Sequence, residues 1–260
     1  MTAIYDQIGK TYDTTRRADP AIVQQMVKLL DLKPQDRCLD VGCGSGNYTY
    51  ALQQTGLLMD GVDISAEMLN KAKTKYPSVQ WHQASVTALP FADNTFDGVT
   101  CVLASHHFSD VMQAFQEMFR VLNTGKIVLF TSTPEQMAYY WLAHYFPKMM
   151  AAGAAKMLSF PYLEEALVAA GFAHVHSQPF FIDEGLVDGF LGIGKHQPEI
   201  YLDEQVRAGM SIFQLHAEPH ELQMGLSQLQ QDITSGAITE IIQQYNAAVG
   251  DYLYVVAEKQ

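Results

Sequence analysis

The sequence predicts an α/β protein with a mostly parallel sheet and a helical segment inserted near its C-terminal end. Two patterns predict this fold class. Short β-like runs alternate with helical patterns from residue 37 to about residue 133, the order of elements typical of βαβ units. Residues 184–247 then have a mostly helical pattern, and residues 252–257 are again β-like. We therefore expect an α/β domain of residues 1–183 and 248–260, interrupted by a helical insertion of residues 184–247.

Each element of the alternating region is predicted from its apolar periodicity and its end signals. A first helix is expected after Asp19-Pro20, because aspartate caps helices and proline suits their first turn. Five strands are expected at residues 37–41, 58–64, 79–83, 96–103 and 126–131. Helices are expected between them at residues 48–54, 66–76 and 111–122. Asn123-Thr124-Gly125 is expected to end the last of these helices, since such residues tolerate left-handed backbone.

The part of the chain after the fifth strand is less regular. Helices are expected at residues 135–150 and 161–170, before a β-like run at residues 172–182. The aromatic run at residues 137–146 suits either the wall of an apolar pocket or, at helical spacing, a hydrophobic core. An apolar face of the insertion packs either onto the domain or across a homodimer interface; it is formed by Leu222, Leu226, Leu229, Ile233 and Ile238.

Composition indicates a globular enzyme that acts on small molecules. The 260 residues are 48% hydrophobic and 17% charged, which is ordinary for a folded domain. A net charge of −12 opposes binding to nucleic acid, whose phosphates are held largely by lysine and arginine. No apolar stretch approaches the roughly 20 residues of a membrane span, and the N-terminus lacks a signal-peptide pattern. We expect a protein without a nucleic-acid or membrane partner.

The number and spacing of the cysteines indicate a reducing compartment. Cys38, Cys43 and Cys101 are odd in number and fall at no metal-ligand spacing, so neither a disulfide framework nor a metal site is expected. Reduced thiols fit a cytoplasmic location.

A glycine-rich turn and a following acid are the strongest functional signal in the sequence. The turn joins the first predicted strand to its helix and reads Asp40-Val41-Gly42-Cys43-Gly44-Ser45-Gly46-Asn47. Glycine allows the tight turn and lets a ligand approach the backbone, because it has no Cβ. Asp63 lies 21 positions after Gly42, at the end of the next predicted strand, where a carboxylate can accept hydrogen bonds from both ribose hydroxyls. The order strand, loop, helix, strand and acid predicts a nucleoside-binding site.

Two departures from the dinucleotide pattern indicate which nucleoside binds. Dinucleotide sites use Gly-x-Gly-x-x-Gly and place the pyrophosphate at the helix N-terminus, whereas here the third glycine, Gly46, comes one position early. Asp40 lies just before the loop, where a carboxylate repels a pyrophosphate but attracts the ammonium and sulfonium groups of S-adenosylmethionine. Cationic S-adenosylmethionine therefore fits this loop better than NAD.

The loop also resembles the first motif of class I S-adenosylmethionine-dependent methyltransferases, through Leu39-Asp40-Val41-Gly42-Cys43-Gly44-Ser45-Gly46. Three more segments are similar to motifs of that family: Asp63-Ile64-Ser65-Ala66-Glu67-Met68-Leu69, Leu89-Pro90-Phe91-Ala92-Asp93-Asn94-Thr95-Phe96-Asp97 and Arg120-Val121-Leu122-Asn123-Thr124-Gly125-Lys126. Together they cover residues 36–131 and resemble the ubiquinone and menaquinone biosynthesis methyltransferases (methyltransferase type 11). The resemblance implies a Rossmann-like sheet with an antiparallel last strand, an inserted helical lid, S-adenosylmethionine as methyl donor and S-adenosylhomocysteine as product.

The resemblance assigns cofactor contacts to particular residues. Within the motifs they are Asp40, Gly42, Cys43, Gly44, Asn47, Asp63, Ile64 and Met68. Ser85 and Val86 stand where similar enzymes carry an acidic residue for the adenine amino group, so the hydroxyl and the backbone are expected to bind there instead. Ala104 is expected near the transferred methyl group. From the N-terminal arm, Tyr12 and Arg17 are expected either to reach the carboxylate of the cofactor or to hold the arm on the surface.

The methyl acceptor is expected to be a small, partly apolar molecule. His106 and His107 follow the fourth predicted strand, at the edge where α/β sheets bind ligands, and are candidates either for a general base or for a positioning role. Polar residues of the insertion either meet an acidic acceptor or lie on a solvated face; they are Lys195, His196, Arg207 and His216.

Two other functions compete with methyl transfer. One is an NAD-dependent oxidoreductase, which Asp40 and the glycine spacing disfavour. The other is a non-catalytic, cofactor-binding regulatory partner, since a fold alone does not establish chemistry.

Overall fold

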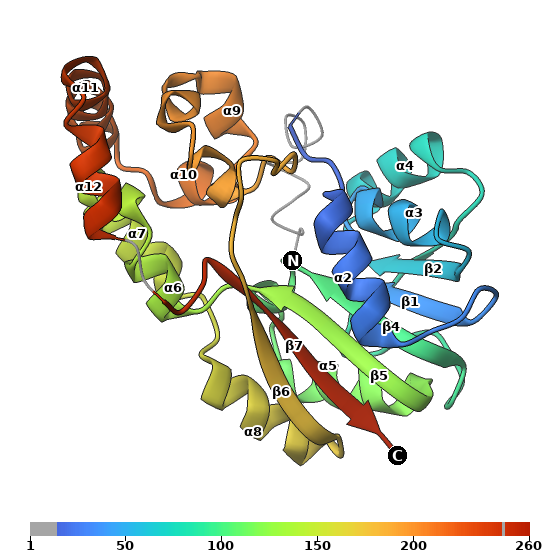
Figure 1. The fold of residues 1–260 in the computed structure, drawn as a ribbon. Helices are drawn as coiled ribbons and strands as arrows, with labels where there is room; N and C mark the ends of the chain where they lie inside the picture. Colours follow the sequence, from blue (N-terminus) through green and yellow to red (C-terminus); the bar gives the residue numbers. More distant parts are fainter. Residues whose placement is uncertain (1–14, 246–247) are drawn as a thin grey trace.

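The computed structural model describes residues 15–245 and 248–260. In the described residues, seven strands form one sheet in the order β3-β2-β1-β4-β5-β7-β6 (Figure 1). They are β1 (Arg37–Val41), β2 (Leu58–Asp63), β3 (Gln80–Gln83), β4 (Phe96–Val102), β5 (Leu122–Thr131), β6 (Ala173–Phe180) and β7 (Tyr252–Lys259). β1 to β5 pair in parallel, whereas β7 runs antiparallel between β5 and β6. The predicted fold class, with its antiparallel last strand, is confirmed.

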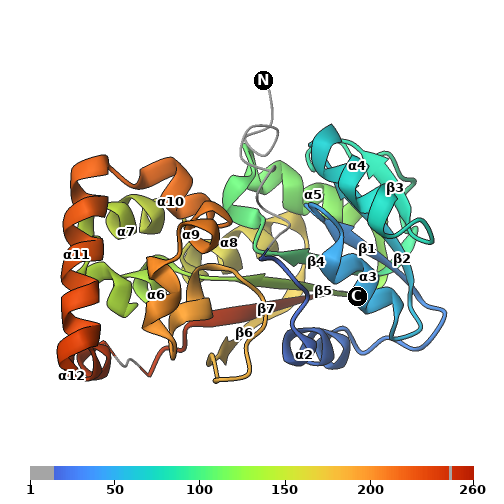
Figure 2. The same cartoon turned by 90° about the horizontal axis from the view of Figure 1, so that it is seen from above.

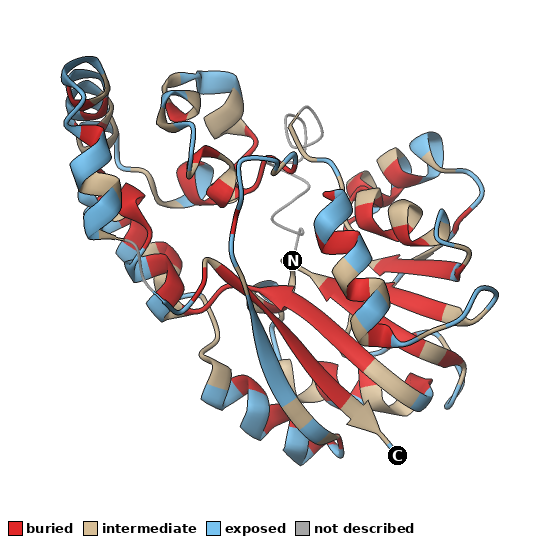
Figure 3. Ribbon diagram, viewed as in Figure 1, coloured by how far each residue is buried: buried red, intermediate tan, exposed pale blue. Residues whose placement is uncertain are grey.

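Helices cover both faces of the sheet. They are α2 (Pro20–Leu30), α3 (Asn47–Gln53), α4 (Ala66–Lys75), α5 (Val111–Val121) and α8 (Phe160–Ala170). α2 and α3 share a hydrophobic cluster on one face, and α5 and α8 share another on the opposite face. The apolar face of α5 is fully buried at Phe115, Met118 and Val121. The central strands are accordingly shielded from both sides, while the edge strand β6 is largely exposed (Figure 3).

The predicted turn at Asn123-Thr124-Gly125 is wrong. α5 ends at Val121 and β5 begins directly at Leu122, earlier than the predicted residue 126. None of these three residues has the left-handed backbone expected of a helix stop. Gly125 has a different reason to be glycine, because a Cβ there would lie 2.2 Å from the carbonyl oxygen of Asp97. Close approach of β5 to the start of β4 therefore explains the glycine.

The single helix predicted at residues 135–150 is three short helices. They are α6 (Pro134–Ala138), the 3₁₀ helix η2 (Trp141–His144) and α7 (Pro147–Ala154). Pro147 interrupts the helix because it lacks an N–H and disfavours helical backbone at the preceding residue. The aromatic run belongs to a hydrophobic core, in which Trp141 and Phe146 are almost fully buried. The core alternative is therefore the one that the structure bears out.

Residues 191–244 are mostly helical, as the pattern predicts. They form η3 (Leu191–Gly194), η4 (Pro198–Leu202), α9 (Glu204–Ala208), α10 (Ser211–His216), α11 (Pro219–Ser235) and α12 (Ile238–Gln244). These helices share one hydrophobic cluster with α6, η2 and α7, so the packing joins segments on both sides of residue 184. The predicted apolar face of the insertion packs into this cluster, with Leu229 and Ile238 buried.

We call α6, η2, α7 and the helices from η3 to α12 the helical cluster. It lies beyond the carboxyl ends of the parallel strands (Figures 1 and 2). This is the edge at which open α/β sheets bind ligands. Among the described residues, no helix has the length and apolarity needed to cross a membrane.

Candidate active site

The glycine loop between β1 and α3 presents bare backbone. Gly42 and Gly46 adopt left-handed backbone, with φ of 71° and 82°. A Cβ at Gly42 would lie 2.6 Å from the Cβ of Ala104, and one at Gly46 would lie 2.3 Å from the Trp81 ring. Both backbone conformation and neighbouring atoms therefore exclude larger residues at these two positions.

Asp63 is fixed between the glycine loop and the next helix. Its Oδ2 accepts a hydrogen bond from the Gly44 N–H at 2.8 Å, and its Oδ1 accepts one from the Ser65 N–H at 2.8 Å. Ser65 in turn caps α4 by accepting from the Met68 N–H. Each carboxylate oxygen has further lone pairs, so the same group can also accept from ribose hydroxyls. The predicted ribose ligand thus has a defined orientation relative to the loop.

Asp40 lies beneath the loop and has little contact with solvent. It is 2% exposed and accepts hydrogen bonds from the hydroxyls of Thr49 at 2.6 Å and Thr100 at 3.0 Å. Burial raises its pKa to about 6, although the two hydroxyls oppose the shift. In this arrangement Asp40 offers a ligand in the loop its charge rather than an exposed contact.

Asn47 and Cys43 are held by neighbouring protein groups. The Asn47 amide donates to the Arg16 carbonyl, and its Oδ1 accepts from Lys75 at 2.7 Å and Tyr76 at 3.0 Å. Burial raises the pKa of the Cys43 thiol well above its usual value, which keeps it neutral. Both residues thus support the shape of the loop.

The residues predicted to surround the adenine lie at the ends of β2 and β3. Ile64 is 58% exposed, whereas Met68 is buried beneath Gly44. The Ser85 hydroxyl is hydrogen-bonded to the Thr87 hydroxyl at 2.8 Å, and Val86 packs against the core behind it. Ile64 therefore offers the exposed apolar surface that an adenine ring needs.

The N-terminal arm meets the insertion at a buried carboxylate. Arg16 forms a bidentate ion pair with Asp188, at 2.7 and 3.1 Å, and the Tyr48 hydroxyl donates to Asp188 at 3.0 Å. Asp188 is fully buried, and it also accepts from the Arg17 backbone N–H. The Arg17 side chain is exposed, and Tyr12 lies outside the described residues. Arg16, not the predicted Arg17, therefore points into the molecule.

The two histidines stand on a short 3₁₀ helix, η1 (Ser105–His107), just beyond β4. The preceding Leu103 adopts left-handed backbone with φ of 52°, a conformation that costs a non-glycine residue about 1 kcal/mol or more. The Ser105 hydroxyl and His106 Nδ1 are buried without a hydrogen-bond partner among the described residues. Backbone strain is often found at active sites, and a ligand could pair with the two unpartnered polar atoms.

Burial controls the charge of both histidines. It lowers the pKa of His106 to about 3, with a smaller contribution from His107, whose ring centroid is 4.0 Å away. The pKa of His107 is lowered to about 4 by the surrounding protein atoms, although its ring still faces open space. Both side chains are therefore neutral at pH 7.

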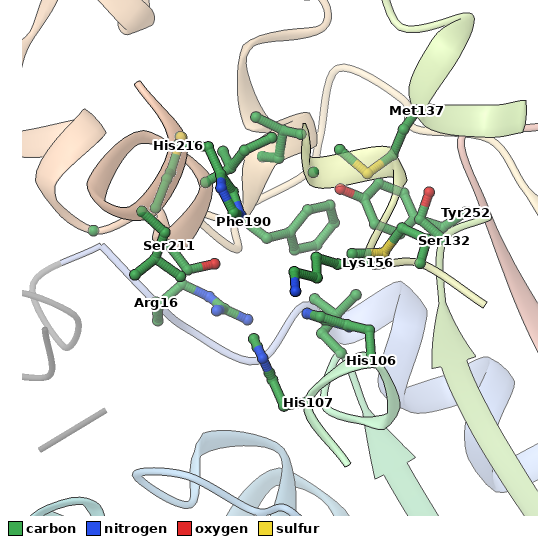
Figure 4. A pocket seen from close by; sticks show the side chains of 18 of the residues that line it. Arg16, His106, His107, Ser132, Met137, Lys156, Phe190, Ser211, His216 and Tyr252 are labelled. Carbon is green, nitrogen blue, oxygen red and sulfur yellow. The ribbon is translucent and has the colours of Figure 1, made fainter. Parts of the chain in front are cut away.

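A cavity of about 590 Å³ separates η1 from the helical cluster (Figure 4). Its size suits a small organic molecule. The apolar wall consists of Leu103, Phe108, Met137, Met157, Phe190, Leu191, Met210, Ile212, Leu215 and Tyr252. Polar side chains in the wall are those of Arg16, His106, His107, Ser132, Lys156, Ser211 and His216. No residue of the glycine loop lines it, but Phe108 of its wall lies 3.9 Å from the position that a Cβ on Gly42 would take, so the cavity adjoins the glycine loop.

The structure separates the polar residues predicted in the insertion. Only His216 lines the cavity. Lys195 forms an ion pair with Asp251 at 2.6 Å, and Arg207 donates to the Tyr201 carbonyl at 2.6 Å. His196 is hydrogen-bonded to the Ile182 carbonyl.

Several residues of the site were missed from the sequence. Asp188 and Arg16 are 172 positions apart, and no local pattern links them. Lys156 is a single cation after an apolar helix, which is a weak signal on its own. Among the described residues, no group of three or more potential ligands could hold a metal ion.

Comparison with known proteins agrees with this geometry. The family model described as a methyltransferase domain matches residues 39–130. A crystal structure from Anabaena variabilis, of a protein described as a methyltransferase from an antibiotic biosynthesis pathway, is 32% identical, with a TM-score of 0.85 over 94% of this chain and 99% of that one. The chain belongs to the class I S-adenosylmethionine-dependent methyltransferases.

Other members of the family match a smaller part of the chain. The 2-phytyl-1,4-naphtoquinone methyltransferase of a Nostoc species is 36% identical over 137 residues, which are 47% of this chain and 59% of that protein. A demethylmenaquinone methyltransferase of Bacillus cereus is 31% identical over 152 residues, or 52% of this chain and 64% of that protein. The matches to these curated relatives thus span about 60% of their length.

The residues present fit the S-adenosylmethionine of this family. The glycine loop has no room for a Cβ at Gly42 or Gly46, Asp63 is oriented at its edge, and Asp40 places a carboxylate beneath it. The unpartnered polar atoms of Ser105 and His106 lie on the adjoining η1. This combination suits a cationic nucleoside better than a dinucleotide, because a buried acid beside a pyrophosphate would be repulsive.

Proposed function

We propose that this chain transfers a methyl group from S-adenosylmethionine to a small-molecule acceptor bound in the cavity beside η1. The observation that carries the proposal is the position of that cavity. It adjoins the end of β4, next to the glycine loop and Asp63, and its other walls come from the helical cluster. Donor and acceptor sites therefore meet at the carboxyl edge of the sheet.

The protein contributes mainly by positioning the reactants. When bound, S-adenosylmethionine would supply a methyl group for in-line displacement, in which a bond from the acceptor to the methyl carbon forms as the carbon–sulfur bond breaks and S-adenosylhomocysteine leaves. The glycine loop and Asp63 fix the nucleoside, while Asp40 offers a negative charge beneath it. The apolar cavity wall excludes water and holds the acceptor near the methyl group.

We infer that His106 and His107 position the acceptor rather than remove a proton from it. An efficient general base has a pKa near the working pH, whereas the pKa of His106 is about 3 and that of His107 about 4. Neutral imidazoles can still donate or accept a hydrogen bond at the acceptor. An acceptor whose attacking atom is already ionised, or carries a free lone pair, needs nothing more from them.

The helical cluster supports a role as a lid over the acceptor. α10 supplies four residues of the cavity wall, and segments next to α7 and η3 supply others; all of them lie outside the segment matched by the family model, which ends at residue 130. The named relatives act on quinones, but their matches cover only about half of this chain. We propose a cytoplasmic enzyme with a small-molecule partner and no nucleic-acid partner, consistent with its net charge of −12.

The cofactor site is tested by calorimetry. S-adenosylhomocysteine should bind to the purified protein, and NAD should not. Asp63→Ala should raise the dissociation constant by about 100-fold or more, because two ribose hydroxyls lose a charged partner. Glu164→Ala is the matched control, since Glu164 is an exposed acid on α8 and should leave the affinity unchanged.

Activity is tested by following formation of S-adenosylhomocysteine with a panel of small acceptors. Turnover with at least one acceptor is the expected result. Absence of cofactor binding, or unchanged affinity in Asp63→Ala, would contradict the assignment of the site. Cofactor binding without turnover across a broad panel would favour a regulatory role instead.

A further inference from the structure

In the part of the chain that the structure describes, Lys156 is the one lysine in the wall of the acceptor cavity, in the turn that follows α7. Its ammonium and the side chains of Arg16, His106 and His107 point into the same space (Figure 4). The lysine within α7, Lys148, has its ammonium 3.6 Å from the Glu218 carboxylate, and that of Lys195 is 2.6 Å from the Asp251 carboxylate. Among the described residues, no carboxylate lies within ion-pair distance of Lys156.

The cavity wall contains no acidic residue among those described. The wall thus differs from the chain as a whole, which has 28 acidic and 16 basic residues. Arg16 is the other permanent cation of the wall, but its guanidinium is already bound by Asp188 through two hydrogen bonds. Lys156 is therefore the cation with charge left to offer a ligand.

The histidines around the cavity do not supply a second positive charge. The pKa of His216 is lowered by burial and by the nearby Lys156 ammonium. Those of His106 and His107 are lowered by burial. At neutral pH the cavity thus combines an apolar wall, one available ammonium and several neutral hydrogen-bonding groups.

We propose that Lys156 binds the carboxylate of the acceptor, and that the acceptor is an acid with an otherwise apolar body. The assignment rests on the proposed methyl transfer and adds the chemical class of its substrate. Lys156 is exposed at the edge of the cavity, and a single ammonium there matches a single carboxylate, since a charge-assisted hydrogen bond is stronger than one between neutral groups. The cavity of about 590 Å³, with its largely apolar wall, accommodates an aromatic ring or a short alkyl chain.

The test compares acids with their uncharged counterparts. Benzoate, cinnamate and decanoate are titrated into protein saturated with S-adenosylhomocysteine, each beside its primary amide. We expect at least one acid to bind about tenfold or more tightly than its amide. In Lys156→Gln this preference should fall to about onefold, and in Lys156→Arg it should persist. Lys148→Gln, which removes a lysine charge from α7 outside the cavity wall, should keep the wild-type preference.

The outcomes separate this inference from the proposed function. The affinity for S-adenosylhomocysteine and the thermal midpoint report whether each variant is folded and binds cofactor. If the cofactor binds but acids and amides bind equally, or if Lys156→Gln keeps the preference for acids, the role of Lys156 is refuted while methyl transfer stands. If phosphate monoesters bind more tightly than every carboxylate, the carboxylate assignment is overturned. If no cofactor binds, the proposed function itself fails.

Discussion

The cofactor side and the acceptor side of this molecule are built in different ways. The cofactor side uses residues close in sequence: a loop of residues 40–47 and an acid at the end of the next strand, joined by hydrogen bonds such as that from Gly44 to Asp63. The acceptor cavity draws its wall from residues between 16 and 252, including η1, α7, η3 and α10. Local order thus specifies the donor site, whereas long-range packing specifies the acceptor site.

We expect the largest effect from a substitution confined to the cofactor side. Gly42→Ala should abolish measurable binding of S-adenosylhomocysteine, because the new Cβ would lie 2.6 Å from Ala104 on left-handed backbone. Gly236→Ala is the matched control. Gly236 has φ of 84° but no atom within 4 Å of the added Cβ, so it should cost about 1 kcal/mol of stability and leave binding unchanged. Calorimetry and urea unfolding measure both effects. Equal losses of binding in the two variants would contradict this explanation.

A second substitution tests the ion pair between Arg16 of the N-terminal arm and Asp188. Asp188→Asn should lower the free energy of unfolding by about 3 kcal/mol, because it leaves the Arg16 guanidinium buried without its counter-charge. Glu218→Gln breaks the exposed pair with Lys148 and should cost less than about 1 kcal/mol. Urea unfolding provides both values. A loss in Asp188→Asn no larger than in Glu218→Gln would show that the buried pair does not hold the arm to the insertion.

As pH falls, protonation of His106 on the acceptor side and of Asp40 on the cofactor side should change the free energy of unfolding in opposite directions. The folded pKa of His106 is about 3, below its value of roughly 6.5 in an unfolded chain, so the unfolded state binds more protons and stability falls as pH drops through this range. The folded pKa of Asp40 is about 6, above its unfolded value of about 3.9, so protonation of Asp40 adds stability as pH drops from 6 to 4.

Variants can resolve these opposing contributions. Between pH 6.5 and pH 4.5, His106→Asn should reduce the loss of stability by about 1 kcal/mol or more, and Asp40→Asn should increase that loss. Urea unfolding at several pH values measures the slopes. A shallower acid loss in Asp40→Asn would contradict the raised pKa of this residue.

The smallest expected effect lies wholly within the helical cluster. Tyr140→Phe removes a buried hydroxyl that is 2.6 Å from the Tyr201 hydroxyl, and should cost about 1 kcal/mol. Tyr139→Phe is the neighbouring control, since Tyr139 is 54% exposed and should change stability little. Cofactor affinity should be unchanged in both variants. A marked fall in cofactor affinity in Tyr140→Phe would mean that the two sides are more closely coupled than their packing indicates.

Much of the fold was predictable because its signals are local. The strands and helices between residues 37 and 131 follow apolar periodicity. The glycines of the loop predict a tight turn, whose left-handed backbone other residues rarely adopt. The errors lie where a tertiary contact replaces a local preference. Gly125 is glycine because β4 approaches it, and the helix predicted at residues 135–150 breaks at Pro147 around a shared core.

By itself, the sequence determined the sheet, the nucleoside loop and the class of donor, because each depends on residues within a few turns or strands of one another. Only the tertiary structure decided the rest of the site. It selected Arg16 over Arg17 through a partner 172 positions away, withdrew Asp40 from solvent, and placed Lys156 in the cavity without a carboxylate partner. Burial and charge pairing depend on which distant segments meet, and no local pattern encodes that meeting.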